Sequence, residues 1–294
     1  MGAPATQLGR IWWNYNEPHL MVKEDKYADY YDRHLPAPGA PIRMLELGVQ
    51  SGGSVRAWRQ YYGSNLYYVG VDINPLCNRS HSPRENLHIE IGSQGDGAFL
   101  EQLCLKHGPF NVIIDDGQHN SEMIRASLEI LFPSSKCMAV ESVYAIEDTH
   151  TMMWHRFNEG NPSTIYSLAG EAWWSQHFYW APRMKPGRTT YPGGRNGGSP
   201  THPHPTFGRM VKGVHAYDSM LLIERSAQHR QMREIQRGTS KVAVQECLQS
   251  GLRPAPVVPD RMSCRPKTTG EIWQEKDARY PRVTTSSSTG AQKP

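Results

Sequence analysis

The sequence contains little cysteine and no cysteine pair at metal-binding spacing. Its five cysteines among 294 residues are widely spaced, and none belongs to a Cys-x-x-Cys pair. Zinc sites and dithiol redox motifs are built on such pairs, so the sequence does not indicate either. We therefore expect free thiols in a reducing compartment for all five, which are Cys77, Cys104, Cys137, Cys247 and Cys264.

Long apolar runs are also absent. No stretch reaches the roughly 20 apolar residues of a membrane-spanning helix, and the first residues lack the charged-then-apolar pattern of a secretory signal. The opening Met1–Thr6 fits the short template for N-myristoylation of Gly2, but no basic cluster or early cysteine supplies a second anchoring signal. We therefore expect a cytoplasmic protein without a membrane span.

The charge is mild and dispersed. The formal net charge is +4, which does not indicate a dedicated nucleic-acid-binding surface. The length suits one sizeable α/β domain with additional segments. We expect an N-terminal extension over residues 1–24 and a main domain over 25–225 that contains a long insertion or lid at about 158–210. The polar residues 226–294 are expected to form a disordered tail.

Short β-rich runs alternate with amphipathic stretches between Ile42 and Glu147, which is typical of a mostly parallel sheet flanked by crossover helices. Helical spacing of apolar residues predicts helices over Asp25–Leu35 and over Ser121–Phe132, and Pro133 ends the second. A further β-like stretch covers Val214–Glu224. The five main strands are predicted at Ile42–Glu46, Leu66–Val71, Leu87–Ile91, Asn111–Ile114 and Val143–Ile146.

A glycine-rich loop follows the first predicted strand. Gly48, Gly52 and Gly53 allow a tight turn in which backbone N–H groups approach a ligand at a helix N-terminus. Such a loop could hold a nucleotide phosphate or the amino-acid part of S-adenosylmethionine, or serve only as a turn. Asp72 ends the second strand, where a carboxylate can accept hydrogen bonds from ribose hydroxyls. Asp72 therefore suits either cofactor.

Acidic residues follow the fourth and fifth predicted strands. Asp115, Asp116 and His119 follow the fourth, and Glu147 and Asp148 follow the fifth. Because the carboxyl ends of parallel strands share one edge of a sheet, we expect these side chains to converge. Such crowding is costly without a cation, and oxygen ligands favour magnesium, manganese or calcium. In the alternative interpretation, Asp115 or Asp116 caps the next helix and the later pair is solvated.

Taken together, these motifs resemble the macrocin, mycinamicin and rhamnosyl O-methyltransferase family, which includes the cephalosporin hydroxylase-like proteins. The resemblance runs from Asp25 to Trp154 and resumes at Val214–Ser219. It implies a Rossmann-like class I methyltransferase fold and transfer of a methyl group from S-adenosylmethionine to a hydroxyl of a small sugar-like or glycosylated natural product. The segments that carry it are Met44–Ser54, Tyr68–Pro75, Gly108–His119 and Val143–Asp148.

The resemblance also implies site residues. Asp116, Glu147 and Asp148 would hold Mg²⁺ or Mn²⁺, and His119 would be the general base for the substrate hydroxyl, whose pKa falls on coordination to a dication. Alternatively, His119 only orients a neighbouring loop. Ser93 departs from the acidic residue that the family commonly has there. The implied cofactor-binding residues are Glu46, Gly48, Ser54, Asp72, Ser93, Gln94 and Asp115.

Two other classes compete with this interpretation. An NAD(P)-dependent oxidoreductase could use a similar sheet, but the glycine spacing after Glu46 departs from Gly-x-Gly-x-x-Gly and acidic clusters have no role in hydride transfer. A catalytically silent S-adenosylmethionine-binding protein should have lost some of the base and ligand residues, which are all present. We expect a small hydroxylated substrate and no nucleic acid as partner. The sequence leaves open whether the chain forms a homo-oligomer.

Overall fold

The computed structural model describes residues 4–154, 157, 164–176 and 210–226. Most of the predicted insertion at 158–210 and, beyond Ser226, the predicted tail lie outside the described residues. None of the helices in the described ranges has the length and apolarity that a membrane span requires. The predicted domain limits at residues 24 and 226 stay predictions.

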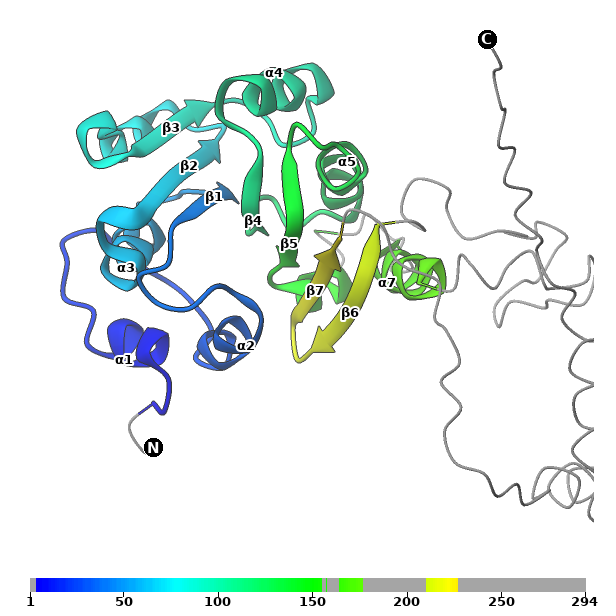
Figure 1. Cartoon of the computed structure of the whole chain (residues 1–294), viewed down its shortest axis with the longest axis horizontal. Helices are drawn as coiled ribbons and strands as arrows, with labels where there is room; N and C mark the ends of the chain where they lie inside the picture. Colours follow the sequence, from blue (N-terminus) through cyan, green and yellow to red (C-terminus); the bar gives the residue numbers. More distant parts are fainter. Residues whose placement is uncertain (1–3, 155–156, 158–163, 177–209, 227–294) are drawn as a thin grey trace, which may run out of the picture. The chain divides into compact units, whose positions relative to one another are not determined.

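A seven-stranded sheet forms the centre of the described chain (Figure 1), in the order β3-β2-β1-β4-β5-β7-β6. The first five strands run parallel, and β7 pairs antiparallel with both β5 and β6. The predicted mostly parallel sheet is confirmed. The strands are β1 (Ile42–Leu47), β2 (Leu66–Asp72), β3 (Leu87–Ile91), β4 (Phe110–Asp115), β5 (Met138–Ile146), β6 (Val211–Tyr217) and β7 (Met220–Arg225).

Two strand predictions differ from the structure. The fifth strand begins at Met138 instead of Val143. Its first half pairs irregularly with β4, and Glu141 there has a φ of 55°, so this half lacks the regular apolar pattern by which a strand is predicted. The β-like stretch Val214–Glu224 is a hairpin of two strands, β6 and β7. Ser219 lies between them with a φ of 63°, a left-handed conformation that lets the chain reverse.

Helices cover both faces of the sheet. The helix predicted over Ser121–Phe132 is present and is capped by the side chain of Asn120, which accepts hydrogen bonds from the Glu122 and Met123 amides. The cap is therefore not one of the aspartates that follow β4. The described helices are α1 (Gln7–Trp13), α2 (Tyr27–His34), α3 (Gly53–Tyr62), α4 (Gly97–His107), α5 (Ser121–Leu131) and α7 (Thr164–Ser175).

The apolar core has two layers, one on each face of the sheet. Side chains of α4, α5 and α7 pack with Leu45 on one face, and side chains of α1, α2 and α3 pack with Met44 on the other. The predicted N-terminal extension takes part in the second layer: Leu8 is fully buried, and the Trp12 ring packs edge-on against Tyr31 with centroids 6.4 Å apart. Helix α1 therefore belongs to the same core as the sheet.

One cysteine expectation is wrong. Cys104 near the end of α4 and Cys137 just before β5 form a disulfide, although 33 positions separate them in the sequence. The two cysteines meet because α4 leads directly into β4, and β4 begins beside the residues that enter β5. There the Phe110 amide donates a hydrogen bond to the Cys137 carbonyl. Cys77 is a buried free thiol. The spacing of 33 gave no local signal for this pair. Cys247 and Cys264 lie outside the described residues.

Candidate functional site

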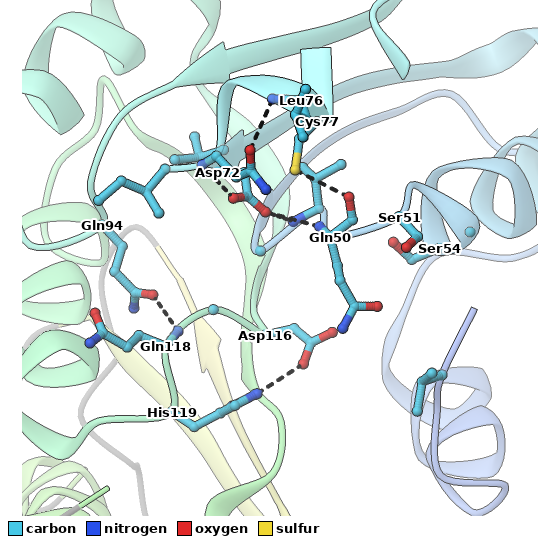
Figure 2. A pocket seen from close by; sticks show the side chains of 18 of the residues that line it. Gln50, Ser51, Ser54, Asp72, Leu76, Cys77, Gln94, Asp116, Gln118 and His119 are labelled. Atoms are coloured by element: carbon cyan, nitrogen blue, oxygen red, sulfur yellow. Dashed lines mark hydrogen bonds and ion pairs between the residues drawn. The ribbon is translucent and has the colours of Figure 1, made fainter. Parts of the chain in front are cut away.

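A cavity of about 690 Å³ opens at the carboxyl ends of the parallel strands (Figure 2). This volume is in the range of small-molecule and cofactor sites. Its walls come from Gly48–Ser54 after β1, Asp72–Cys77 after β2, Gly92–Gln94 after β3, Asp116–His119 after β4, and the N-terminal segment Leu20–Lys23. Ligands of open α/β sheets bind at this edge.

The glycine loop after β1 brings the backbone close to the fourth strand. Gly48 has a φ of 96°, and a Cβ at this position would lie 2.0 Å from the Asp116 carbonyl oxygen. Only glycine satisfies both the left-handed conformation and this approach. Helix α3 begins five residues later, at Gly53. The loop is thus the tight strand-to-helix turn that the sequence predicted, and it borders the cavity.

Asp72 is held by backbone donors beside the cavity. Its Oδ2 accepts hydrogen bonds from the amides of Val49 (3.0 Å) and Gln50 (2.9 Å), and its Oδ1 accepts one from Asn74 (2.8 Å). Although partial burial acts in the opposite direction, these backbone N–H groups lower the pKa of Asp72 below its usual value. The carboxylate is therefore ionised and fixed where the sequence places a ribose contact.

The residues after β3 connect the cavity wall to the fourth strand. Gln94 donates from Nε2 to Asp115 (3.1 Å) and accepts from the Gln118 amide (2.8 Å), as Figure 2 shows for Gln118. Ser93 accepts a hydrogen bond from the Gly95 amide. Both Ser93 and Gln94 line the cavity, and their role in cofactor binding stays a prediction.

Two of the predicted cofactor-binding residues are fully buried and do not line the cavity. Glu46 accepts hydrogen bonds from Ser54 (2.9 Å) and from the Tyr68 hydroxyl, and Asp115 accepts one from Ser127 (2.7 Å). Burial raises the pKa of both carboxyl groups. These acids support the wall from behind, whereas Ser54 itself faces the cavity.

Asp116, His119 and Asp148 converge as the sequence predicts. Nε2 of His119 lies 3.8 Å from Asp116 Oδ1 and 3.6 Å from Asp148 Oδ2, and ligand atoms of the three residues all lie within 4.8 Å of one another. Figure 2 shows the Asp116 and His119 side chains directed toward each other. Both His119 and Asp148 have positive φ, 55° and 53°, a conformation that non-glycine residues adopt mainly where the surrounding structure demands it.

Glu147 lies apart from this group and contacts a lysine. Its two carboxylate oxygens are each 2.9 Å from Nζ of Lys23, and the Tyr31 hydroxyl donates to Oε1 at 2.5 Å. Burial, with repulsion from Asp116, raises the pKa of Glu147 to about 8, while Lys23 acts to lower it. Glu147 and Asp116 thus share the Lys23 ammonium, but Glu147 is not among the residues whose ligand atoms lie within 4.8 Å of one another.

Sequence analysis missed Lys23, which comes from the segment before α2. Lys23 lies in a stretch of mixed charges and had no distinguishing signal, yet its side chain is only 3% exposed. Tyr27 and Tyr31 were assigned to an apolar helical face. Their rings do pack inward, but their hydroxyls reach the acids, and Tyr27 donates to Asp148 at 2.6 Å. The four-residue spacing of these tyrosines was the available signal.

Comparisons with known proteins find O-methyltransferases. No family model matches the chain. It is 33% identical over 139 residues to demethylmacrocin O-methyltransferase of Streptomyces fradiae, and 32% identical over 139 residues to mycinamicin VI 2''-O-methyltransferase of Micromonospora griseorubida; each match covers 45% of this chain and 33% of the relative. The predicted resemblance is confirmed. The chain spans about a third of the length of these curated relatives.

Solved structures decide the fold. MycE methyltransferase from the mycinamycin biosynthetic pathway, in complex with Mg and SAH, superposes with a TM-score of 0.60 at 22% identity, covering 87% of this chain and 61% of that one. Its complex with Mg, SAH and mycinamycin VI gives 0.58 at 24% identity, covering 76% and 55%. The chain has the class I methyltransferase fold. In this methyltransferase fold, Asp116, His119 and Asp148 line the same cavity at the carboxyl edge of the sheet.

Proposed function

We propose that this chain is an S-adenosylmethionine-dependent, divalent-metal-dependent O-methyltransferase that acts on a hydroxyl of a small sugar-like or glycosylated natural product. One observation carries the proposal: the Gly48 turn, Asp72 and the group of Asp116, His119 and Asp148 all line one cavity. The names of the relatives and the Mg and SAH in the MycE structures support it.

The cavity suits S-adenosylmethionine. In the proposed arrangement the Gly48 turn and Ser54 face the methionine end, Asp72 accepts hydrogen bonds from the ribose hydroxyls, and Ser93 and Gln94 lie beside the adenine. Glu46 and Asp115, which are buried behind the wall, hold Ser54 and Gln94 by hydrogen bonds. The ionised Asp72 and the close backbone approach at Gly48 are the features that fit this cofactor.

The acidic residues suit a hard divalent cation. We propose Asp116, Glu147 and Asp148 as ligands, since carboxylate oxygens are the donors that Mg²⁺ and Mn²⁺ prefer. When bound, S-adenosylmethionine supplies the methyl group, and the metal ion lowers the pKa of a coordinated hydroxyl. The ligand atoms of Asp116 and Asp148 already lie within 4.8 Å of each other, whereas Glu147 faces Lys23.

His119 is proposed as the general base. Nε2 faces the two aspartates at the cavity rim, so it can receive the hydroxyl proton there, and both carboxylates stabilise the resulting imidazolium. Nδ1 is buried and has no hydrogen-bond partner among the residues that the structure describes. The ring is therefore oriented from its Nε2 side, by Asp116 and Asp148.

We infer a small-molecule partner, because the mild net charge of +4 does not favour nucleic acid. A cytoplasmic location stays a prediction, and the Cys104–Cys137 disulfide does not support the reducing compartment on which it partly rested.

The direct test is methyl transfer from labelled S-adenosylmethionine, with magnesium, to a panel of glycosides, macrolides and phenols. We expect transfer to a glycoside and loss of transfer on chelation. Asp116→Ala should abolish metal-stimulated turnover and leave cofactor affinity nearly intact, because Asp116 belongs to the acidic group and not to the Asp72 side of the cavity. Equal activity of the variant and its parent would refute the ligand assignment.

A further inference from the structure

A single buried cation joins the acids of three strands. Nζ of Lys23 lies 2.6 Å from Asp116 Oδ2, 2.9 Å from both oxygens of Glu147 and 3.4 Å from Glu46 Oε1. Its side chain is 3% exposed. Glu46 is the second-last residue of β1, whereas Asp116 and Glu147 directly follow β4 and β5. The proposed reaction gives this ammonium no role, although it contacts two of the three proposed metal ligands.

The ammonium offsets part of the negative charge of the acids. Carboxyl groups gathered in a buried space repel one another when ionised, unless a cation or protons neutralise them. Although burial disfavours a charged lysine, Asp116, Glu147 and Glu46 raise the pKa of Lys23 above its usual value. Lys23 therefore supplies, from the chain itself, one positive charge to Glu46, Asp116 and Glu147.

The same position is needed by a metal ion that Asp116 and Glu147 hold together. Oxygen ligands lie roughly 2.0–2.6 Å from magnesium or calcium, and the ammonium already has oxygens of both residues at 2.6 and 2.9 Å. Two cations cannot share this space, because charges of like sign at about 3 Å repel strongly in a buried site. Both oxygens of Glu147 contact Nζ, so Glu147 cannot turn toward an ion without giving up contacts with the lysine.

We infer that the Lys23 ammonium and the proposed divalent ion compete for Asp116 and Glu147, so that binding of the ion displaces Lys23 and loosens the segment Leu20–Lys23 that lines the cavity. The inference rests on the proposed function. The segment packs tightly on the first turn of α3, where a Cβ on Gly53 would lie 2.3 Å from the Leu20 carbonyl oxygen. Metal loading is thereby coupled to the wall of the cofactor cavity.

The first test is metal affinity measured by calorimetry with Mn²⁺ alone. Lys23→Met removes the competing charge and keeps much of the apolar stem. If the lysine-bound arrangement outweighs the released one by about ten to one, Lys23→Met should bind Mn²⁺ about tenfold more tightly than the parent. Lys26→Met is the matched control, because Lys26 is exposed and its ion pair among the described residues is with the exposed Asp218, at 3.3 Å. This variant should bind Mn²⁺ as tightly as the parent does.

The second test uses the unaltered chain, so it does not depend on the folding of a variant. Hydrogen exchange of the backbone amides of residues 20–24 should accelerate when Mn²⁺ is added, because displacement of Lys23 removes the anchor of the segment. The amides of β1, which is buried in the sheet, should be unchanged. Asp148→Asn should suppress the acceleration, since Asp148 is a proposed ligand that does not contact Lys23.

The outcomes separate this inference from the proposed function. Tighter binding by Lys23→Met, or faster exchange of the segment on metal addition, supports the competition. Equal or weaker Mn²⁺ binding by Lys23→Met, together with unchanged exchange in the parent, overturns it and leaves a metal-dependent enzyme in which Lys23 stays in place. Absence of Mn²⁺ binding in both the parent and Lys23→Met overturns the inference and the metal dependence together.

Discussion

At the scale of single residues, Gly48 is the position where both the backbone conformation and the cavity wall require that no Cβ be present. A Cβ there would lie 2.0 Å from the Asp116 carbonyl oxygen, and the residue has a φ of 96°. Gly48→Ala should therefore reduce the free energy of unfolding by about 1–3 kcal/mol or more, measured in urea, and weaken S-adenosylmethionine binding. Gly39→Ala is the matched control: its φ is 73°, but a Cβ would have nothing within 4 Å. Equal losses in the two variants would show that the contact with Asp116 is unimportant.

His119 separates two roles at the same scale. If His119 is the general base, His119→Ala should lower kcat by roughly 10²–10⁴-fold and retain the affinity for Mn²⁺. Its Nε2, however, lies within 4.8 Å of ligand atoms of Asp116 and Asp148, which also suits a metal ligand. Calorimetry with Mn²⁺ distinguishes the two: a loss of metal affinity that matches the loss of turnover would assign His119 to the metal and leave the base unidentified.

At the scale of elements, α2 is joined to the β6–β7 hairpin by His34. Its Nδ1 lies 3.2 Å from Glu224, its Nε2 lies 2.8 Å from the Tyr217 hydroxyl, and its ring faces His215 with centroids 4.1 Å apart. Burial, with the neighbouring charges of His215 and Arg33, lowers the pKa of His34 below 6.5, while Glu224 opposes the shift. The folded state therefore binds fewer protons than the unfolded state near that pH.

This linkage predicts the direction of a pH effect on stability. A histidine whose pKa is lowered by folding contributes stability that is present above pH 6.5 and is lost as the pH falls through the folded pKa. The free energy of unfolding of the parent should thus fall between pH 7 and 5 more steeply than that of His34→Gln, which cannot titrate. Urea unfolding at several pH values measures both slopes. Identical slopes would mean that His34 does not link the hairpin to protonation.

Elements of the sheet could be predicted from the sequence where their apolar runs were continuous, and the site acids could be predicted where they followed such runs. Asp72, Asp116 and Asp148 were located in this way. The start of β5 could not be predicted, because Glu141 and its neighbours interrupt the apolar run. The Lys23 contacts depend on how the N-terminal segment folds back over three strand ends, and no local pattern encodes that.

At the scale of the whole molecule, the sheet order places β1 and β4 side by side, so that the cofactor loop after one strand meets the acidic turn after the other. Residues from before the sheet reach the same edge: Lys23 of the N-terminal segment and Tyr27 and Tyr31 of α2 contact acids that follow β4 and β5. The proposed site is therefore assembled from the sheet together with the segment and helix that precede it, and ligand binding should stabilise this part of the chain as a unit.

Ligand linkage makes this measurable without a known substrate. S-adenosylhomocysteine at 100 times its Kd should raise the free energy of unfolding by about 2.7 kcal/mol, because only the folded chain has the cavity. Asp72→Ala should remove most of this gain, since it deletes the ionised carboxylate at the cavity wall. Asp218→Ala, which alters an exposed aspartate paired with Lys26, should keep the full gain. A full gain in the free energy of unfolding in Asp72→Ala would mean that the ligand binds elsewhere. The chain would then have a methyltransferase fold without using this cavity for the cofactor.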